Sequence, residues 1–277
     1  MKTLITGNKG FVGKYVEDIF ARNNAEVLGF DIQDGKNICD YEKLKAASNG
    51  CDVIIHLAAV DNNNAVEIVR NNIIGTMNVL NIFEETSLKK LIFMSSMDSL
   101  GIFQGEDKPK YLPIDDEYPC HSQTTYSVSK YANENMCRYY YSICNKPILC
   151  LRAPGIWSEN TYGEIIERRK KTPHYEWKPY WEYGAFIDVR DLAEAIYLAA
   201  KTNFSGFHCY SISSDDITTS GKTSKELVDF LFTGIEWKGD YTYTENPYKT
   251  LVQNGNIKKL LNWNPKYSWK DAIRKFV

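Results

Sequence analysis

The sequence of 277 residues has no apolar run that approaches the roughly 20 residues of a membrane-spanning helix. It also has no internal repeat and no low-complexity stretch that would mark a linker. Its first residues, MKTLITG, enter a strand pattern directly, without the charged and apolar regions of a signal peptide. We therefore expect a cytoplasmic protein with no membrane partner.

An excess of charge of either sign is missing as well. The chain has 33 Lys and Arg against 35 Asp and Glu, a formal net charge of -2 and a pI near 6.1. A strongly basic surface would favour nucleic acid or anionic lipid, and this composition gives no such indication. We expect no nucleic-acid partner, while a small neutral or anionic ligand remains open.

Paired cysteines of the kind that bind metals are also absent. The seven cysteines are scattered, odd in number and form no Cys-x-x-Cys pair, so we interpret them as reduced thiols and expect no metal site. Hydrophobic residues make up 43% of the chain. A chain of this length and composition can bury a large core and fits one two-lobed unit.

What the sequence does contain is a regular alternation in its first half. The runs KTLIT, EVLGF, DVIIHL, KLIFMSS and PILCLR have the length of strands buried on both faces. Amphipathic helical stretches lie between them, for example at 65–85 and 125–144. This alternation predicts an α/β fold, with a parallel sheet and helices on both sides.

A glycine-rich segment, LITGNKGFVGKYV, joins the first strand to a helix that begins near Phe11. Glycines such as Gly7, Gly10 and Gly13 permit a tight turn, close approach of the backbone to a pyrophosphate and close packing of helix on strand. Their spacing differs from the commoner Gly-x-Gly-x-x-Gly, and a plain glycine-rich turn is the alternative. We predict a Rossmann-type doubly wound sheet that binds a dinucleotide.

Asp31 ends the second predicted strand, about twenty residues beyond the glycines. A carboxylate at this place accepts hydrogen bonds from an adenosine ribose and repels a 2′-phosphate, so the sequence favours NAD over NADP. Lys9 weakens this preference, because a cation in the glycine loop could contact a 2′-phosphate. A turn or helix-capping carboxylate is the alternative interpretation of Asp31.

The pattern changes after Gly155. Residues 156–185 are rich in Pro, Trp and Tyr and hold one helical candidate at 163–171. Order returns with AFIDVRDLAEAIYLAA and FHCYSI, and a further helix is predicted near 224–232. We predict a dinucleotide-binding domain at 1–155, to which 186–213 returns, and a small substrate lobe built from 156–185 and 214–277.

Two Tyr-x-x-x-Lys pairs occur in the chain, Tyr126 with Lys130 in QTTYSVSKYANEN and Tyr41 with Lys45. A spacing of four places both side chains on one helix face. Spacing alone therefore does not distinguish a catalytic pair from two residues on a solvated helix.

Seven motifs occur in a characteristic order, namely TGNKGFVG, Asp31, DVIIHLAA, NNIIGTMNVL, FMSSMDSLG, YSVSK and FIDVRDLAEAI. With them the chain resembles the extended short-chain dehydrogenase/reductase superfamily, in its NAD-dependent sugar epimerase/dehydratase group. The likeness reaches about residue 200 and resumes weakly at LLNWNPKYSWKDAI. It implies an NAD-dependent oxidoreductase or epimerase for a sugar or nucleotide sugar, and a homodimer formed through the helices at 65–85 and 125–144.

The same resemblance implies a catalytic role for Tyr126 and Lys130, with Ser96 as the hydroxyl at the end of the strand KLIFMSS. Ser95 is the less favoured hydroxyl, and Tyr41 precedes every such strand, so its pair with Lys45 is predicted to be an exposed helical pair. In this chemistry the ammonium favours the phenolate, which takes a proton from the substrate as hydride leaves for NAD.

Further cofactor contacts also follow from the resemblance. Asn37 and Ile38 match an adenine-binding pair, and Asn72 matches an Asn near the nicotinamide, whereas His56 is interpreted as a core histidine. The predicted cofactor residues are Gly7, Lys9, Gly10, Phe11, Val12, Gly13, Asp31, Ile32, Asn37, Ile38, Leu57, Ala58, Ala59, Asn72, Tyr126, Lys130, Ala153 and Pro154.

Several positions depart from the family's pattern. Leu100 replaces a usual Tyr, and Gly155 stands where nucleotide-sugar enzymes typically carry an Asn. A dehydratase would have an acidic pair after the catalytic hydroxyl, whereas here Met97 is followed by a single acid, Asp98. The short chain and the run SSMDSLG resemble a smaller branch, the uronate dehydrogenase-like enzymes that oxidise a free sugar with NAD, and this is our alternative function.

The substrate residues are predicted in and beside the small lobe. Arg168 and Arg169 could bind a carboxylate or phosphate, and Trp181 could stack on a sugar ring, with a solvated helix end and simple packing as the alternatives. Asp98 and Gly155 complete this set. A non-catalytic NAD-binding sensor is a remote alternative.

Overall fold

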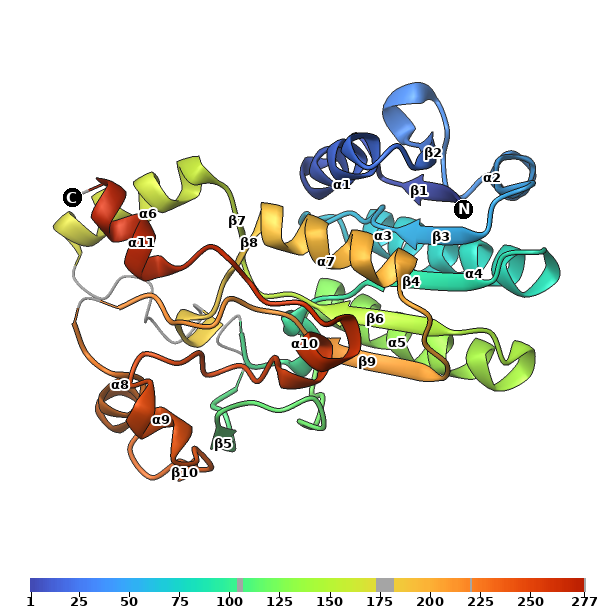
Figure 1. Cartoon of the computed structure of the whole chain (residues 1–277). Helices are drawn as coiled ribbons and strands as arrows, with labels where there is room; N and C mark the ends of the chain where they lie inside the picture. The colour runs from blue at the N-terminus through green and yellow to red at the C-terminus, as the bar shows by residue number, and fades with distance from the viewer. Residues whose placement is uncertain (104–106, 173–181, 220, 277) are drawn as a thin grey trace.

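The computed structural model describes residues 1–103, 107–172, 182–219 and 221–276. Six parallel strands form its central sheet (Figure 1). They lie in the order β2-β1-β3-β4-β6-β9, with bounds β1 (Lys2–Thr6), β2 (Glu26–Phe30), β3 (Val53–His56), β4 (Lys90–Met94), β6 (Ile148–Arg152) and β9 (Phe207–Ser211). The strands β3, β4 and β6 are buried along their whole length, because helices cover both faces of the sheet. The predicted α/β fold with a parallel sheet is confirmed.

Two layers of helices enclose this sheet. One face is covered by α1 (Phe11–Arg22), α7 (Val189–Lys201) and α10 (Gly255–Leu261), whose apolar residues share a core cluster with the strands. The other face is covered by α2 (Tyr41–Ser48), α4 (Thr76–Glu85) and α5 (Thr125–Cys144). Helix α5 has the bounds predicted from the sequence, 125–144.

The helix predicted at 65–85 has a more complex form. It consists of α3 (Ala65–Ile68), a π-helical segment η2 (Val69–Gly75) and α4. The Asn64 side chain caps its start by accepting hydrogen bonds from the backbone N–H groups of Val66 and Glu67, at 3.2 and 3.3 Å. A π-helical segment changes the direction of the side chains that follow it, so a regular helical repeat does not predict which residues of this segment face inward.

A smaller lobe lies beyond the carboxyl ends of the strands, to the left in Figure 1. The pairing of β7 (Ile156–Trp157) with β8 (Ile187–Asp188) and of β5 (Tyr111–Leu112) with β10 (Glu236–Trp237) forms two short sheets. The remaining elements are α6 (Glu159–Lys171), α8 (Ser224–Leu231), α9 (Thr242–Glu245), α11 (Trp269–Phe276) and the 3-10 turns η1 (Ile32–Asp34), η3 (Met97–Leu100) and η5 (Glu182–Gly184).

Helix α6 starts four residues before the predicted 163, because Ser158 and Thr161 form a capping box at its N-terminus.

The domain boundaries remain a prediction, and the two predicted domains share part of their hydrophobic core. Met97, Leu100 and Phe103, within the predicted first domain, share a core cluster with Tyr183 and Leu227 of the lobe. In the part of the chain that the structure describes, no helix is both long enough and apolar enough to cross a bilayer.

Candidate active site

The glycine loop is fixed between β1, α1 and the end of β3. Gly7 has a φ of +74°, and a Cβ atom there would lie 2.7 Å from the backbone nitrogen of Ala58. A Cβ atom on Gly13 would lie 2.2 Å from the carbonyl oxygen of Gly7. Both positions therefore require glycine, the first for its backbone conformation and both for the close approach of neighbouring backbone.

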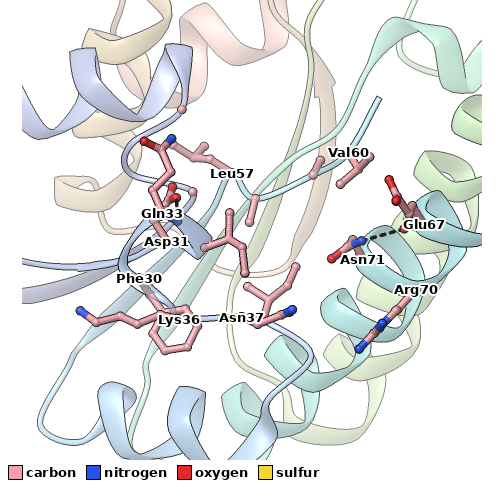
Figure 2. Close-up of a pocket in the computed structure, with 16 residues that line it drawn as sticks. Phe30, Asp31, Gln33, Lys36, Asn37, Leu57, Val60, Glu67, Arg70 and Asn71 are labelled. Atoms are coloured by element: carbon pink, nitrogen blue, oxygen red, sulfur yellow. Dashed lines mark hydrogen bonds between the residues drawn. The ribbon is translucent and has the colours of Figure 1, made fainter. Parts of the chain in front are cut away.

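A cleft of about 490 Å³ opens next to this loop (Figure 2). Asp31 and Gln33, which follow β2, face Glu67 and Asn71 of the helix α3–η2 across it. The predicted cofactor residues that line this cleft are Gly7, Gly10, Asp31, Ile32, Asn37, Ile38, Leu57, Ala58 and Ala59. Residues far apart in the sequence thus meet where the first three strands end.

Sequence reasoning did not name the other lining residues, Phe30, Gln33, Lys36, Val60, Glu67, Arg70 and Asn71. Phe30, Gln33, Lys36 and Val60 adjoin predicted positions, so proximity in the sequence was an available signal. The other three, Glu67, Arg70 and Asn71, lie on α3 and η2. A regular helical repeat does not predict which side chains of this segment face the cleft, because part of it is π-helical.

Asp31 is 5% exposed and has both carboxylate oxygens engaged by backbone groups. Its Oδ2 accepts a hydrogen bond from the backbone N–H of Lys9 at 3.0 Å, and its Oδ1 accepts one from Gln33 at 2.8 Å. The ammonium of Lys9 forms an ion pair with Asp34, and this hydrogen bond raises the pKa of Lys9. The Lys9 ammonium is therefore already paired with a carboxylate.

Lys130 lies beneath Tyr126 at the start of α5. A capping box between Thr124 and Ser127 fixes the first turn of this helix, so Tyr126 is held one residue inside it. Lys130 is 3% exposed, and its Nζ donates to the carbonyl oxygen of Met94 at 2.9 Å. The same Nζ lies 5.5 Å from the centre of the Tyr126 ring. The pair predicted from the sequence is thus in contact.

Burial lowers the pKa of Lys130 to about 8, and the charges of Asp61, Glu134 and Asp98 oppose this shift. At neutral pH the amine therefore remains largely protonated. A cation held against the Tyr126 ring by a backbone carbonyl favours the phenolate over the phenol.

The two candidate hydroxyls after β4 have different surroundings. Ser95 is buried, and its hydroxyl donates to Glu134 Oε1 at 2.6 Å, within the buried ion pair of Glu134 and Arg152. Ser96 is half-buried and accepts a hydrogen bond from the backbone N–H of Asp98 at 3.1 Å. Because a structural ion pair engages Ser95, the surroundings favour Ser96 as the hydroxyl available to a substrate.

Asn72 holds the loop between the two halves of the site. Its side chain accepts a hydrogen bond from the backbone N–H of Val60 at 2.8 Å and donates to the Val60 carbonyl at 2.9 Å. It also donates to the Ser129 hydroxyl at 3.1 Å, beside Lys130 in sequence. Asn72 therefore links Val60, which lines the cleft next to the glycine loop, to helix α5.

A second cleft of about 430 Å³ adjoins Tyr126. Asp61, Asn62, Asn63, Ala65, Ile68, Asp98, Thr124, Thr125 and Tyr126 line it. Asp98 was predicted as a substrate residue, whereas Asp61, Thr124 and Thr125 were not. The signal for the two threonines was available in the sequence, since they directly precede Tyr126.

Other predicted residues lie outside both clefts. Ala153 and Pro154 are buried after β6, Val12 packs on the core, and Phe11 is exposed at the start of α1. The carbonyl of Gly155 accepts a hydrogen bond from Ile187 at 3.0 Å, next to the short sheet of β7 and β8. These contacts are all within the protein, so the cofactor and substrate roles of these five residues remain predictions.

The predicted substrate cations are engaged within the small lobe. The Arg169 guanidinium lies 4.5 Å from the Trp269 ring centre and donates to the Thr219 carbonyl at 2.6 Å. Burial lowers its pKa to about 10. Arg168 lies on the exposed face of α6. Trp181 and its aromatic neighbours His174, Tyr175, Trp177 and Tyr180 lie outside the described residues.

His56 is a buried core histidine, as predicted, whereas Tyr41 and Lys45, predicted to be an exposed helical pair, are half-buried, because Tyr41 packs on the core. The two ring nitrogens of His56 hydrogen-bond the hydroxyls of Thr6 and Thr76, and burial lowers its pKa to about 3. Tyr41 and Lys45 both contact Glu85 on α4, and the hydrogen bond to Glu85 raises the pKa of Tyr41. A raised pKa is the opposite of what a tyrosine base requires.

A parallel sheet with a glycine loop after its first strand and an acid after its second is the arrangement of Rossmann-type dinucleotide-binding proteins. The model of the NAD dependent epimerase/dehydratase family matches residues 3–212, and the chain belongs to this family. The resemblance inferred from the ordered motifs is thereby confirmed, and the protein is an enzyme of this family.

Similar proteins are consistent with this assignment. A Methanocaldococcus jannaschii protein provisionally named UDP-glucose 4-epimerase is 26% identical, with 99% of this chain and 96% of that protein covered. A short-chain dehydrogenase/reductase superfamily structure from Agrobacterium tumefaciens with bound NAD has a TM-score of 0.72 at 16% identity, covering 100% and 96%. UDP-glucose 4-epimerase from Thermotoga maritima with UDP-glucose has a TM-score of 0.70 at 18% identity, covering 100% and 98%.

Proposed function

We propose that the protein is an NAD-dependent oxidoreductase or epimerase that acts on a sugar or nucleotide sugar, with Tyr126, Lys130 and Ser96 as its catalytic residues. The observation that carries the proposal is the buried Lys130 amine, fixed to Met94 beneath the Tyr126 ring at the edge of a cleft. The names of similar epimerases, one with UDP-glucose bound, support the nucleotide-sugar part of the proposal.

Two features of the cleft next to the glycine loop support a dinucleotide as its ligand. Helix α1 has no acidic residue in its first turn and no side-chain cap at Gly10, so its N-terminal N–H groups favour an anion such as a pyrophosphate. We propose NAD rather than NADP, because a 2′-phosphate next to Asp31 would meet the carboxylates of Asp31 and Asp34, the second already paired with Lys9.

The residues of the chain would divide the chemistry as follows. Tyr126 would accept the proton of the substrate hydroxyl, and Lys130 would hold its charge near the phenolate and favour it. The Ser96 hydroxyl would hydrogen-bond the same substrate oxygen, while its acceptance of the Asp98 N–H fixes its position. NAD, when bound, supplies the hydride acceptor.

The first test is a thermal-shift and NADH-absorbance screen of the purified protein against free aldoses, free uronates and nucleotide sugars, with Tyr126→Phe alongside. We expect Tyr126→Phe to lower kcat by about 10²–10⁴-fold while leaving NAD-induced stabilisation intact. Tyr41→Phe is the matched control, because Tyr41 has the same spacing to a lysine and contacts Glu85 instead. It should keep full activity.

The outcomes separate the alternatives. Epimerised product without net NADH indicates an epimerase that recycles its cofactor. Net NADH with a free sugar supports instead the dehydrogenase of the smaller branch, an assignment compatible with the lack of a side chain at Gly155. A Tyr126→Phe protein that keeps its full cellular role would favour the sensor and refute the proposed chemistry.

We also propose a homodimer formed by α3–η2–α4 and α5. The two helices lie next to each other on one face of the sheet. Both nevertheless keep exposed apolar side chains on the side away from that core. They are Val66, Val69, Ile74 and Met77 on the first and Val128, Tyr131, Tyr139 and Ile143 on the second. Exposed apolar side chains on neighbouring helices are what a subunit interface requires.

A further inference from the structure

A buried ion pair contacts the chain on both sides of Ser96. Its members, Glu134 on α5 and Arg152 at the end of β6, are 4% and 6% exposed. The Arg152 guanidinium donates from Nε to Glu134 Oε1 at 3.0 Å and from Nη2 to Glu134 Oε2 at 2.9 Å. A bidentate pair of this kind holds a carboxylate in one orientation. The Glu134 carboxylate is therefore a fixed acceptor inside the protein.

Two serine hydroxyls near Ser96 share this acceptor. Ser95 Oγ donates to Glu134 Oε1 at 2.6 Å, and Ser99 Oγ donates to the same oxygen at 3.3 Å. Both serines are buried. The backbone N–H of Ser99 also donates to the Ser96 carbonyl at 3.2 Å. The turn that carries Ser96 is thus attached to α5 before and after that residue.

Helix α5 also carries the other two proposed catalytic residues. Tyr126, Lys130 and Glu134 follow one another at intervals of four residues, so they lie close to one face of the helix. Lys130 Nζ donates to the carbonyl of Met94, the last residue of β4. Helix α5 therefore contacts this strand end through Lys130 and the following turn through Glu134. The position of Ser96 relative to Tyr126 depends on both contacts.

We propose that Glu134 is a positioning residue, which holds Ser96 where its hydroxyl and that of Tyr126 reach the same substrate oxygen. The inference rests on the proposed function. A misplacement of a reacting group by about 1 Å can cost about 10²-fold in rate. Glu134 lines neither the cleft next to the glycine loop nor the cleft beside Tyr126. It acts on Ser96 through the hydroxyls of Ser95 and Ser99.

The test removes these hydroxyls and keeps the ion pair. The obvious substitution, Glu134→Gln, leaves the Arg152 guanidinium buried without its carboxylate and can unfold the protein. We expect Ser95→Ala to lower kcat about tenfold with an unchanged KM, because the weakened contact is one that Ser96 makes in the transition state. Ser99→Ala should have a smaller effect, because its hydrogen bond to Glu134 is longer.

A double-mutant cycle with Ser96→Ala separates positioning from a general loss of structure. If Ser95 acts through Ser96, then Ser95→Ala should change kcat by less than about twofold in a protein that already lacks the Ser96 hydroxyl. A merely structural role would lower kcat by the same factor in both backgrounds. Ser48→Ala is the control and should leave kcat unchanged, because Ser48 is a buried serine of α2 whose hydroxyl donates to the Lys45 carbonyl.

Hydrogen exchange gives a readout that does not depend on turnover. The Ser96 hydroxyl accepts the backbone N–H of Asp98 at 3.1 Å, so this amide reports on the order of the turn. We expect the amide of Asp98 to exchange at least about tenfold faster in the variant that combines Ser95→Ala with Ser99→Ala. The amides of α2 should keep their wild-type rates.

In an active enzyme, a Ser95→Ala protein with unchanged kcat, or with the same loss of kcat in both backgrounds, would overturn the inference. A Ser96→Ala protein with full kcat, or a lack of turnover for every sugar, would refute the proposed function instead. In that case the exchange of the Asp98 amide decides whether Glu134 holds the turn. Faster exchange in the combined variant supports this role, and an unchanged rate contradicts it.

Discussion

At the scale of single residues, Asp31 is the residue that we propose to contact the adenosine ribose of the cofactor. Its carboxylate accepts two backbone hydrogen bonds, from Lys9 and Gln33, and lines the cleft. We predict that Asp31→Asn improves NADP binding relative to NAD by about tenfold, since it removes one of the two charges that oppose a 2′-phosphate. Dissociation constants for both cofactors from titration calorimetry measure the change.

The control for this prediction is Asp40→Asn. Asp40 also caps a helix, by accepting from the backbone N–H of Lys43, but it does not line the cleft. Its replacement should leave the ratio of the two dissociation constants unchanged. Wild-type protein that binds NADP as tightly as NAD would contradict the argument.

Asp191 predicts a dependence of stability on pH. It is fully buried on α7, accepts hydrogen bonds from the backbone N–H groups of Lys266 and Tyr267, and burial raises its pKa to about 6. Its folded pKa lies above the ordinary value near 3.9. Between about pH 4 and 6 the Asp191 carboxyl is therefore protonated in the folded state but ionised in the unfolded state. The contribution of this group to stability therefore falls as pH rises through that window.

We expect the free energy of unfolding of the native protein, relative to Asp191→Asn, to fall by up to about 3 kcal/mol between pH 4 and 7. Urea unfolding of both proteins at a series of pH values measures this difference. A difference that stays constant would show that the Asp191 carboxyl titrates at its ordinary pKa in the folded state, and a difference that grows with pH would show that its folded pKa is lowered; either result would contradict the prediction.

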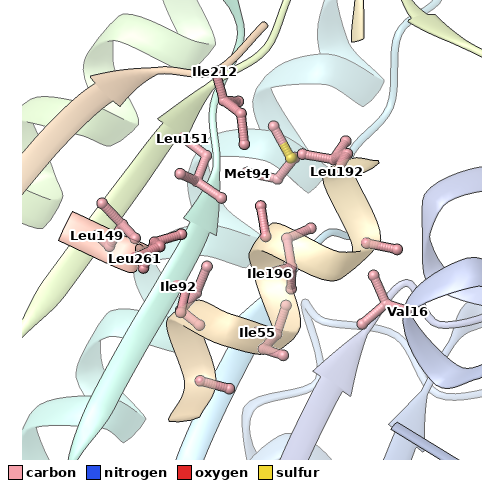
Figure 3. Packing of buried hydrophobic residues seen from close by; sticks show 14 of the residues in the cluster. Val16, Ile55, Ile92, Met94, Leu149, Leu151, Leu192, Ile196, Ile212 and Leu261 are labelled. Carbon is pink, nitrogen blue, oxygen red and sulfur yellow. The ribbon is translucent and has the colours of Figure 1, made fainter. Parts of the chain in front are cut away.

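At the scale of elements, α7 is held to the sheet by its apolar face and by one lysine. Leu192 and Ile196 pack over Ile92 and Leu151 of the strands (Figure 3). Lys90, at the start of β4, donates from Nζ to the carbonyls of Ala199, Ala200 and Thr202 at the end of the helix. These are carbonyl groups that a helix C-terminus leaves without intrahelical partners.

We predict that Lys90→Met lowers the free energy of unfolding by about 2–3 kcal/mol, because buried helix-end carbonyls lose their donors. Lys89→Met is the matched control one residue away. Lys89 has a side chain 74% exposed and pairs with Asp52 on the surface, so its loss should change stability by less than about 1 kcal/mol. Denaturant unfolding compares the two, and equal effects would contradict the capping role of Lys90.

At the scale of the whole molecule, the apolar surface on α3–η2–α4 and α5 predicts the assembly. Met77 and Ile143 are 42% and 52% exposed on these helices. We expect a wild-type mass of twice 31.8 kDa in light scattering at micromolar concentration, and a monomer for Met77→Glu combined with Ile143→Glu, because buried charges oppose association. Phe230→Glu, on the 64% exposed Phe230 of α8, should remain dimeric.

The strands and the glycine-loop end of the candidate site were predictable because their signals are local. A buried parallel strand is a short apolar run, and a glycine loop must lie between adjacent segments such as β1 and α1. Tyr126 and Lys130 needed only one helical turn. The acid after β2 and the hydroxyls after β4 follow their strands directly, so their place at one edge of the sheet follows from the strand order.

The sequence by itself thus determined the sheet, its helices, the family motifs and one half of the candidate site. Only the tertiary structure decided that Ser95 hydrogen-bonds Glu134 while Ser96 does not, that Arg169 packs on Trp269, and that Asp61 and Asp98 line one cleft with Tyr126. The reason is physical. Local periodicity fixes which face of an element is buried, whereas the partner of a polar side chain depends on loops and lobes that come together from distant parts of the chain.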